Sequence, residues 1–336
     1  MKRILFIFIA IFFVLNLITP KAEAHVRYLV DESAVEEYGG LDNEFLLSAL
    51  LDIGIILLTF AGILLAILIA TKVSFVREKL NDVGRRADGY SVFAPWMLRL
   101  SLGIALIGSG TAQTLISPVL EGFGTFATLQ ILLGFLVMSG FLVVPAAIVA
   151  LGLYIFGLMT DWYLIGNLDF AAISLALIFM NNEKPGVDDL LGIEKLNVCT
   201  QKFICACRNL TPLILRLGLG SAMMFLAVYE KILNPHLSEL IVTGFGLVNV
   251  IPVSPEMWVL STGIIEFVIG LAIFFGIFTR ISSAIAFVVI SLSFFYFGED
   301  VSSHITLFGA LSVLFITQGG AWSVDKKLKK INPDFV

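Results

Sequence analysis

Residues 213–233 read LILRLGLGSAMMFLAVYEKIL, an apolar run long enough for one membrane-spanning helix. Similar runs recur along the chain, which is 58% hydrophobic and 14% charged and has a mean hydropathy of +0.98. A soluble domain has a lower fraction of hydrophobic residues, because its surface must be hydrated. The sequence therefore predicts an all-α protein, a polytopic transmembrane helical bundle whose main surroundings are the lipid bilayer.

Nine apolar segments predict nine helices in the mature chain. They lie near residues 45–71, 96–116, 126–140, 142–159, 163–180, 213–233, 257–277, 281–298 and 303–319. Little sequence remains for a water-soluble domain. The chain has no basic stripe and its acidic excess lies mainly near the amino terminus, so we exclude nucleic acid as a partner.

The first 24 residues have the features of a secretory signal peptide. Lys2 and Arg3 precede an apolar run over residues 4–18, and residues 22–24 read Ala-Glu-Ala, a small-x-small cleavage site. Cleavage there predicts a mature chain that begins at His25. The alternative is an uncleaved anchor helix, although the apolar run is short for a full span. Both interpretations place the following segment outside the membrane.

Basic residues indicate the orientation of the helices. If His25 is outside, the helices place the loops 72–95 and 181–212 and the tail from Ser323 on the cytoplasmic side. Sixteen of the eighteen basic residues in the mature chain fall on that side, as the positive-inside rule requires. The sequence predicts a multi-pass protein of a prokaryotic plasma membrane, with the mature amino terminus outside and the carboxyl terminus in the cytoplasm.

Two parts of the chain share one pattern. Residues 98–105 read LRLSLGIA and residues 215–222 read LRLGLGSA, and QILLG at 130–134 corresponds to EFVIG at 266–270. This predicts two tandem four-helix repeats, related by an axis along the membrane normal because four is an even number of crossings. The predicted organisation is a signal peptide (1–24), an exported segment with one transmembrane helix and a basic cytoplasmic loop (25–95), a first repeat (96–192), a cytoplasmic linker that contains the cysteines (193–212), and a second repeat with a cytoplasmic tail (213–336).

The second repeat carries the ionisable residues. Glu230, Lys231, Glu266, Arg280 and His304 align with Gln113, Thr114, Gln130, Val144 and Asn167 of the first. Glu266 lies about nine residues into its helix, roughly 14 Å deep, where an unpaired carboxylate costs several kcal/mol. We therefore expect it to be functional, or else held in a structural ion pair with Lys231 or Arg280. The candidate catalytic residues are Glu266, Lys231, Arg280 and Glu230.

Other acidic residues border the predicted outer loops. Asp161 and Asp169 are two of these. We expect their side chains to be solvated rather than to bind a ligand, because the ends of transmembrane helices reach the aqueous interface.

The three histidines, His25, His236 and His304, all fall on the predicted outer face. After cleavage, His25 would offer a free amine and an imidazole nitrogen, which together suit copper, and a second imidazole would complete the site. The sequence thus suggests a copper site at the mature amino terminus. The alternative is three unconnected interfacial residues, because nothing in the sequence brings them together.

Three cysteines, Cys199, Cys205 and Cys207, lie in the predicted cytoplasmic linker, where a structural disulfide is not expected. Their C-x5-C-x-C spacing matches no zinc or iron–sulfur pattern and lacks a fourth ligand. The thiols are either reactive or palmitoylated, or they are inert loop residues.

The second repeat resembles the DoxX family, which includes the large subunit of archaeal thiosulfate:quinone oxidoreductase. The resemblance covers about residues 212–328 and rests on LRLGLGSAMMFLAVYEKILNP (215–235), EFVIGLAIFFGIFTR (266–280) and GGAWSVDKKL (319–328). It implies a four-helix membrane unit. The positions that match the charged residues of similar family stretches are Arg216, Lys231, Glu266 and Arg280. The first repeat looks like a diverged copy that lacks the ionisable set.

The resemblance and the depth of Glu266 favour an integral membrane subunit of a redox system. In this hypothesis the second repeat binds a quinone in a lateral cleft, Glu266 accepts protons, Lys231 and Arg280 tune it, and a redox partner subunit is a candidate partner. The alternative is a non-enzymatic membrane protein, either a small-solute transporter or an assembly partner of an exported metalloenzyme. The small-residue run Gly218, Gly220, Ser221 and Ala222 would either pair chains in a homo-oligomer or pack the two repeats together.

Overall fold

A computed structural model describes residues 74–180, 186–192, 208–297 and 301–331, together with a few isolated residues (Glu37, Asp42, Phe45, Ala61, Gly62 and Leu65). The signal peptide, His25, the three cysteines and nearly all of the predicted helix at 45–71 lie outside the described residues.

The other eight apolar segments all form helices. These are α7 (Ala94–Thr111), α8 (Ala127–Ser139), α9 (Val143–Thr160), α10 (Leu168–Phe179) after the 3-10 helix η3 (Trp162–Asn167), α13 (Thr211–Leu226) continued by the π-helix η6 (Ala227–Leu233), α15 (Pro255–Phe275), α16 (Thr279–Phe297) and α17 (Val301–Thr317). Within the described residues, six stretches are long and apolar enough to cross a membrane, and α8 and α17 are shorter apolar helices. The predicted all-α polytopic bundle is confirmed.

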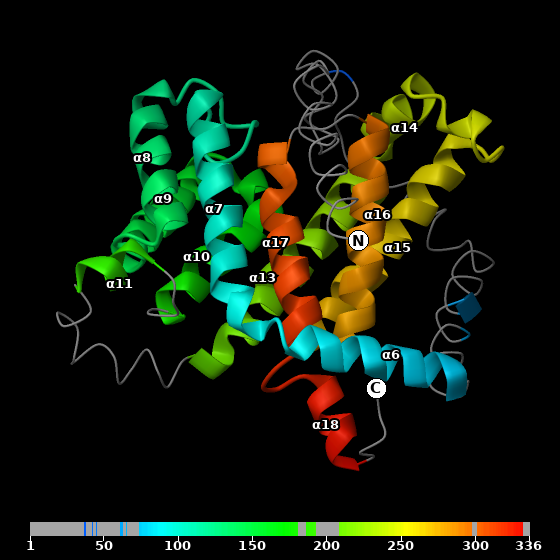
Figure 1. The fold of residues 1–336 in the computed structure, drawn as a ribbon. Coiled ribbons are helices and arrows are strands. Elements are labelled where there is room, and N and C mark those ends of the chain that lie inside the picture. The colour runs from blue at the N-terminus through cyan, green and yellow to red at the C-terminus, as the bar shows by residue number, and fades with distance from the viewer. Residues whose placement is uncertain are drawn as a thin grey trace, which may run out of the picture.

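Helices α7–α10 form the first half of the bundle and α13–α17 form the second half, and the two halves pack against each other (Figure 1). Helix α7 packs on α8 as α13 packs on α15, and α9 packs on α10 as α16 packs on α17. In addition, α17 packs on α7 and α10 packs on α13, so the last helix of each half lies on the first helix of the other. One hydrophobic core joins both halves and includes the fully buried Leu98, Leu215 and Leu311.

Glycines allow the closest helix contacts. A Cβ at Gly134 would lie 2.7 Å from the Gly103 carbonyl oxygen, and a Cβ at Gly220 would lie 2.8 Å from the Gly270 carbonyl oxygen. Such distances are too short for real atoms, so the helix backbones touch. A Cβ at Gly218 would lie 2.8 Å from the Leu168 carbonyl oxygen of α10. In the structure, therefore, Gly218 and Gly220 pack helices within one chain.

The same turn follows α8 and α15. Each helix ends at a glycine with positive φ, 73° at Gly140 and 68° at Gly276, which is the left-handed helix cap. A Cβ at either glycine would collide with a guanidinium group, that of Arg99 or that of Arg216. Substitution of either glycine would therefore displace a buried arginine.

An aspartate closes each of these turns. The Asp188 carboxylate accepts a hydrogen bond from Leu142 N at 3.0 Å, and the Asp325 carboxylate accepts one from Phe278 N at 2.6 Å. The backbone N–H of each aspartate donates in return to the carbonyl of the helix-ending glycine, at 3.2 Å and 3.0 Å. The two halves thus share a set of contacts as well as a helix order.

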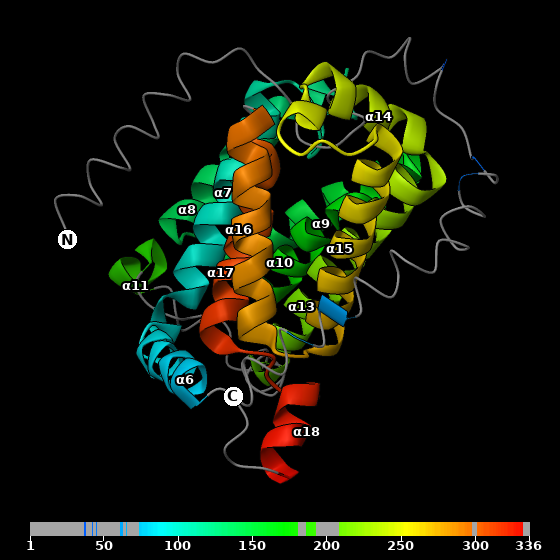
Figure 2. The same ribbon diagram turned by 90° about the vertical axis from the view of Figure 1, so that its right-hand side faces the viewer.

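Among the described residues, three helices lie at the ends of the bundle, two polar ones at one end and one at the other. Helix α6 (Ser74–Asp88) lies across the end at which α18 (Val324–Ile331) is found, whereas α14 (Pro235–Gly244) lies at the opposite end, in both views (Figures 1 and 2). The Arg280 guanidinium fixes α6 through an ion pair with Asp88 at 2.6 Å.

Candidate functional site

A π-helix carries two of the candidate residues. Helix α13 continues into η6, whose wider turns present Glu230 and Lys231 to α15, where Glu266 is located. Single turns of π-helix inside α-helices are frequent at functional sites. Here η6 contains Glu230 and Lys231, two of the ionisable residues of the predicted second repeat.

Lys231 lies between two carboxylates. Its Nζ is 2.7 Å from Glu266 Oε2 and 3.8 Å from Glu230 Oε2. The exposed fractions are 4% for the Glu230 side chain, 14% for Lys231 and 26% for Glu266, so Glu266 is the most accessible of the three. Two carboxylates and one ammonium group leave the cluster with a formal charge of −1 when all are ionised, which favours a proton or a hydrogen-bond donor nearby.

The first half of the chain contributes to this cluster through η3. The Tyr163 hydroxyl, which is buried, donates a short hydrogen bond to Glu230 Oε1. The backbone carbonyl of Glu230 accepts from Ser238 Oγ of α14 at 2.9 Å. Tyr163 thus provides a donor to the buried carboxylate, and Ser238 satisfies the backbone carbonyl of the same residue.

Aromatic rings lie beside the carboxylates. Phe225 and Tyr229 are stacked with ring centroids 5.5 Å apart, and Trp162 stands edge-on to Tyr229 at 5.0 Å. Tyr163 contacts both Phe225 and Tyr229. These offset and edge-on arrangements are favourable for aromatic pairs, and they form an apolar wall that has polar groups at one edge.

Arg280 lies outside this cluster. Its guanidinium binds Asp88 and the carbonyl oxygens of Phe315 and Ile316, at 2.8 Å and 3.1 Å for the carbonyls. Of the two expected partners of Glu266, Lys231 pairs with it and Arg280 does not. The physical reason is that α15 ends at Phe275, so Arg280 begins the next helix at the far end of the span.

The predicted metal site is not formed by the described residues. His236 is 48% exposed and contacts Asp42 at 3.0 Å and Glu239 at 3.3 Å. His304 is buried, and its Nδ1 lies 3.0 Å from Ser303 Oγ. Among the residues that the structure describes, no group of three or more His, Cys, Asp or Glu side chains is arranged to hold a metal. His25 lies outside those residues.

One acidic residue that we expected to be solvated is buried. Asp169, near the start of α10, is 1% exposed, and within the described chain neither carboxylate oxygen has a hydrogen-bond partner at bonding geometry. The Thr306 hydroxyl of α17 faces it. The prediction failed because α17 covers the first turn of α10, a long-range contact that a loop-proximal position in the sequence does not reveal.

The ion pair, the π-helix and the aromatic wall all involve the second half of the chain. Residues 211–299 match the model of the DoxX family. This DoxX segment, about a quarter of the chain, contains α13, η6, α14, α15 and α16, and hence Glu230, Lys231, Glu266 and Arg280. This part of the chain is thus similar to DoxX proteins. Searches of curated proteins and of solved structures gave no match.

The first half has a different arrangement at the position that aligns with Glu266 of the DoxX segment. Gln130 is fully buried, its Oε1 accepts from Ile116 N at 3.0 Å, and its Nε2 donates to the Thr114 carbonyl at 2.7 Å. The amide therefore ties a loop to α8, whereas Glu266 is paired with an ammonium group. Only the DoxX segment presents a titratable group at this position.

Proposed function

We propose that the chain is an integral membrane subunit of a redox system, and that the DoxX segment binds a quinone beside the cluster of Glu230, Lys231 and Glu266. The observation that carries the proposal is the ion pair, 2.7 Å long, between Glu266 in the middle of α15 and Lys231 near the end of the apolar stretch 211–233. Ionisable residues at this depth are expensive and usually mark a substrate or proton pathway.

The residues present fit a quinone. Lys231 would donate a hydrogen bond to a ring oxygen, and Phe225, Tyr229 and Trp162 would offer aromatic faces and edges to the ring. A bound quinone would supply two-electron, two-proton chemistry. Glu266, the most exposed carboxylate of the cluster, would take or give the two protons one after the other. A redox partner subunit would exchange the electrons.

Glu230 would act differently from Glu266. Its side chain is 4% exposed and is held by the Tyr163 hydroxyl, so we assign it the positioning of Lys231 rather than the proton transfer. The ammonium group is then fixed between two carboxylates, and loss of the charge on Glu266 by protonation leaves Lys231 paired with Glu230. Protonation of Glu266 would therefore change the formal charge of the cluster from −1 to zero, with no unpaired charge left in the membrane.

A second candidate function is non-enzymatic, either transport of a small solute or assembly of an exported metalloenzyme. We infer that residues 96–192 and 213–336 are two copies of one unit, and the equivalent Arg–Gly–Asp contacts at Gly140 and Gly276 support this. A duplicated bundle suits transport by repeats that rock around a midplane site. The charge is confined to one half, because Gln130 occupies the position of the first half that is equivalent to Glu266. This difference favours the redox function.

We also propose that the end with α6 and α18 faces the cytoplasm of a prokaryotic cell. These helices carry Lys79, Arg85, Arg86, Lys326, Lys327, Lys329 and Lys330. Their location at one end of the bundle (Figure 1) supports this orientation through the positive-inside rule.

The test is to purify the protein in native-lipid discs and to measure quinone in a lipid extract by mass spectrometry. The proposal predicts about one quinone per chain, lost in Glu266→Gln. The matched control is Glu256→Gln, an exposed glutamate in the first turn of the same helix, which should retain the quinone. Absence of quinone from the unaltered protein would favour the non-enzymatic function.

A further inference from the structure

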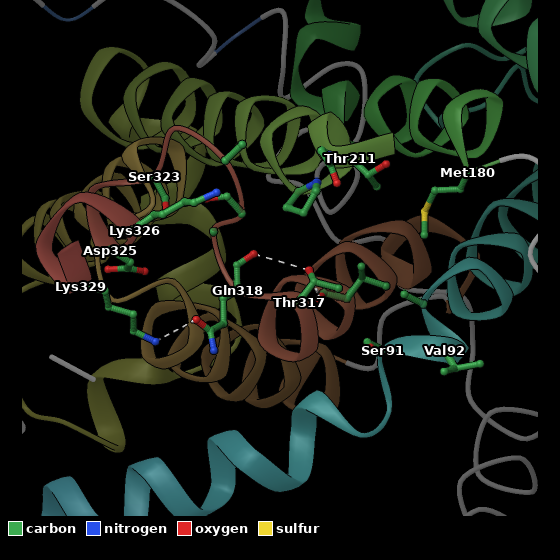
Figure 3. A pocket seen from close by; sticks show the side chains of 17 residues that line it. Ser91, Val92, Met180, Thr211, Thr317, Gln318, Ser323, Asp325, Lys326 and Lys329 are labelled. Carbon is green, nitrogen blue, oxygen red and sulfur yellow. Dashed lines mark hydrogen bonds between the residues drawn. The ribbon is translucent and has the colours of Figure 1, made fainter. Parts of the chain in front are cut away.

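A cavity of about 830 Å³ opens at the end of the bundle that carries α6 and α18 (Figure 3). The ends of α10 and α17 and the starts of α13 and α18 line it, so both halves of the chain contribute. Its volume is within the range of sites for small molecules. The cavity lies at the opposite end of the DoxX segment from α14, which contacts Glu230, and it is therefore separate from the proposed quinone site.

Two ammonium groups line one side of this cavity. Lys326 and Lys329 both come from α18, and Lys329 Nζ donates to Gln318 Oε1 at 3.1 Å. Asp325 is the single acidic residue among the described lining residues. The cavity wall therefore carries a net positive charge.

Asp325 is held away from the lysines by hydrogen bonds to other groups. It is 6% exposed and accepts from Phe278 N at 2.6 Å, from Thr279 N at 2.8 Å and from Thr279 Oγ1 at 2.7 Å. These three hydrogen bonds hold it at the start of α16. The two lysines outnumber this one carboxylate, so the lining attracts an anion.

A buried hydroxyl in the wall lacks a partner. Thr211 lines the cavity and is 3% exposed, and within the described chain its Oγ1 makes no hydrogen bond. A buried donor without an acceptor is destabilising, and a ligand oxygen would satisfy it. Thr211 is also the first residue of α13, where the positive end of the helix dipole favours an anion.

The other side of the cavity is apolar. Met180 and Val92 lie across the cavity from Lys326 and Lys329 in Figure 3, with Ser91 beside Val92. Val313 and Ala94 also line the cavity. A ligand that fills the space would therefore be charged at one end and apolar at the other.

We propose that this cavity binds an amphiphilic phosphate ester, with the phosphate at Lys326 and Lys329, a ligand oxygen at Thr211, and the apolar part against Met180 and Val92. A phosphate group offers several strong acceptors to two ammonium groups and a hydroxyl. Two sources share this chemistry: an anionic phospholipid of the adjacent leaflet and a soluble phosphorylated metabolite.

The test uses the full chain in phosphatidylcholine discs with two probes. Phosphatidic acid is added to the bilayer and counted by native mass spectrometry, and octyl phosphate is added to the solution and followed by calorimetry. Saturable binding of the first probe alone identifies a lipid site, and binding of the soluble probe identifies a site open to the cytoplasm. Either result supports the proposal, whereas no saturable binding of either probe overturns it.

Matched variants distinguish specific binding in the cavity from general attraction of an anion to a basic surface. Lys326→Gln with Lys329→Gln should weaken binding by roughly tenfold or more, because hydrogen bonds to charged groups are lost. Lys327→Gln with Lys330→Gln removes the same charge from the same helix, but neither residue lines the cavity, and binding should stay within about twofold. Equal losses in the two double variants would overturn the proposal.

Thr211→Val distinguishes binding from folding. Valine keeps the shape of threonine and removes an unsatisfied hydroxyl, so the unliganded protein should melt at the same or a higher temperature. Probe affinity should nevertheless fall by about threefold or more, because the ligand oxygen loses its donor. Unchanged affinity would show that Thr211 does not contact the ligand and would contradict the assigned binding mode.

Discussion

The Lys231 ammonium group on η6 lies 2.7 Å from the Glu266 carboxylate on α15, within a part of the chain that is otherwise almost entirely apolar. Lys231→Met should leave both carboxylates without their counter-charge, and Glu266→Gln should leave Lys231 with only its longer contact to Glu230, at 3.8 Å. Lys231→Met or Glu266→Gln alone should each lower the free energy of unfolding by about 1–3 kcal/mol, less than for a fully buried pair because Glu266 is partly exposed. The measurement is chemical unfolding in detergent micelles. The double variant should recover most of the loss, and an additive double variant would show that the two residues are not coupled.

Tyr163→Phe tests the contribution of the first half of the chain to the cluster. The variant removes the hydroxyl that donates to Glu230 and keeps the aromatic contacts with Phe225 and Tyr229. Because Glu230 is buried, we expect a loss of about 1–3 kcal/mol in the free energy of unfolding. We also expect weaker quinone retention in the disc assay. If the variant retained as much quinone as the unaltered protein, Tyr163 would not contribute to the proposed site.

Arg280→Gln should loosen α6 without loss of quinone. Arg280 contacts Asp88 and two carbonyl groups at the end of α17, and it does not contact Glu266. Hydrogen exchange should therefore quicken in residues 82–88, with Asp88→Asn giving a smaller effect of about 0.3–1 kcal/mol because Asp88 is exposed. Loss of quinone in Arg280→Gln would contradict the separation of Arg280 from the cluster.

Glycine substitutions at two kinds of position should have opposite effects. A Cβ at Gly220 would lie 2.8 Å from backbone atoms of α15, so Gly220→Ala should destabilise the protein by about 1–3 kcal/mol. A Cβ at Gly152 in α9 has no atom within 4 Å among the described neighbours, and Gly152→Ala should stabilise by about 0.5–1 kcal/mol. Thermal unfolding of the two variants in one detergent compares them directly.

Asp325→Asn should lower the free energy of unfolding more than the same substitution of a surface aspartate. Its carboxylate accepts three hydrogen bonds at the start of α16, so we expect a loss of about 2–4 kcal/mol. Asp82→Asn is the control. The Arg85 side chain, which donates a hydrogen bond to Asp82, lowers the pKa of this carboxyl, but the pair is on the exposed face of α6. Its replacement should leave the melting temperature nearly unchanged.

The helices were predictable from the sequence because each has a continuous apolar run. The predicted segment 142–159 corresponds to α9, and 163–180 corresponds to η3 with α10. The largest difference is at the end of α7, which stops at Thr111, five residues before the predicted 116. There the polar Gln113 and Thr114 leave the helix, and Gln130 holds the resulting loop.

The contacts between helices were less predictable. The depth of Glu266 and its pairing with Lys231 were among the expected alternatives, since both follow from helix length and charge. The contacts Tyr163–Glu230 and Arg280–Asp88 join residues 67 and 192 positions apart. Hydrophobic periodicity describes which side of a helix is buried but not which helix covers it, and for the same reason the burial of Asp169 was not foreseen.

The packing of α17 on α7 has a consequence for biosynthesis. About 190 residues separate the end of α7 from the start of α17, so the ribosome needs roughly 10–40 s to supply this partner after α7 is made. During that time the face of α7 that will hold α17, which includes Ser101 and Gly108, has only lipid or the insertion machinery to contact. A nascent chain stalled before residue 301 should therefore remain bound to that machinery, and its release should coincide with the completion of the last helix.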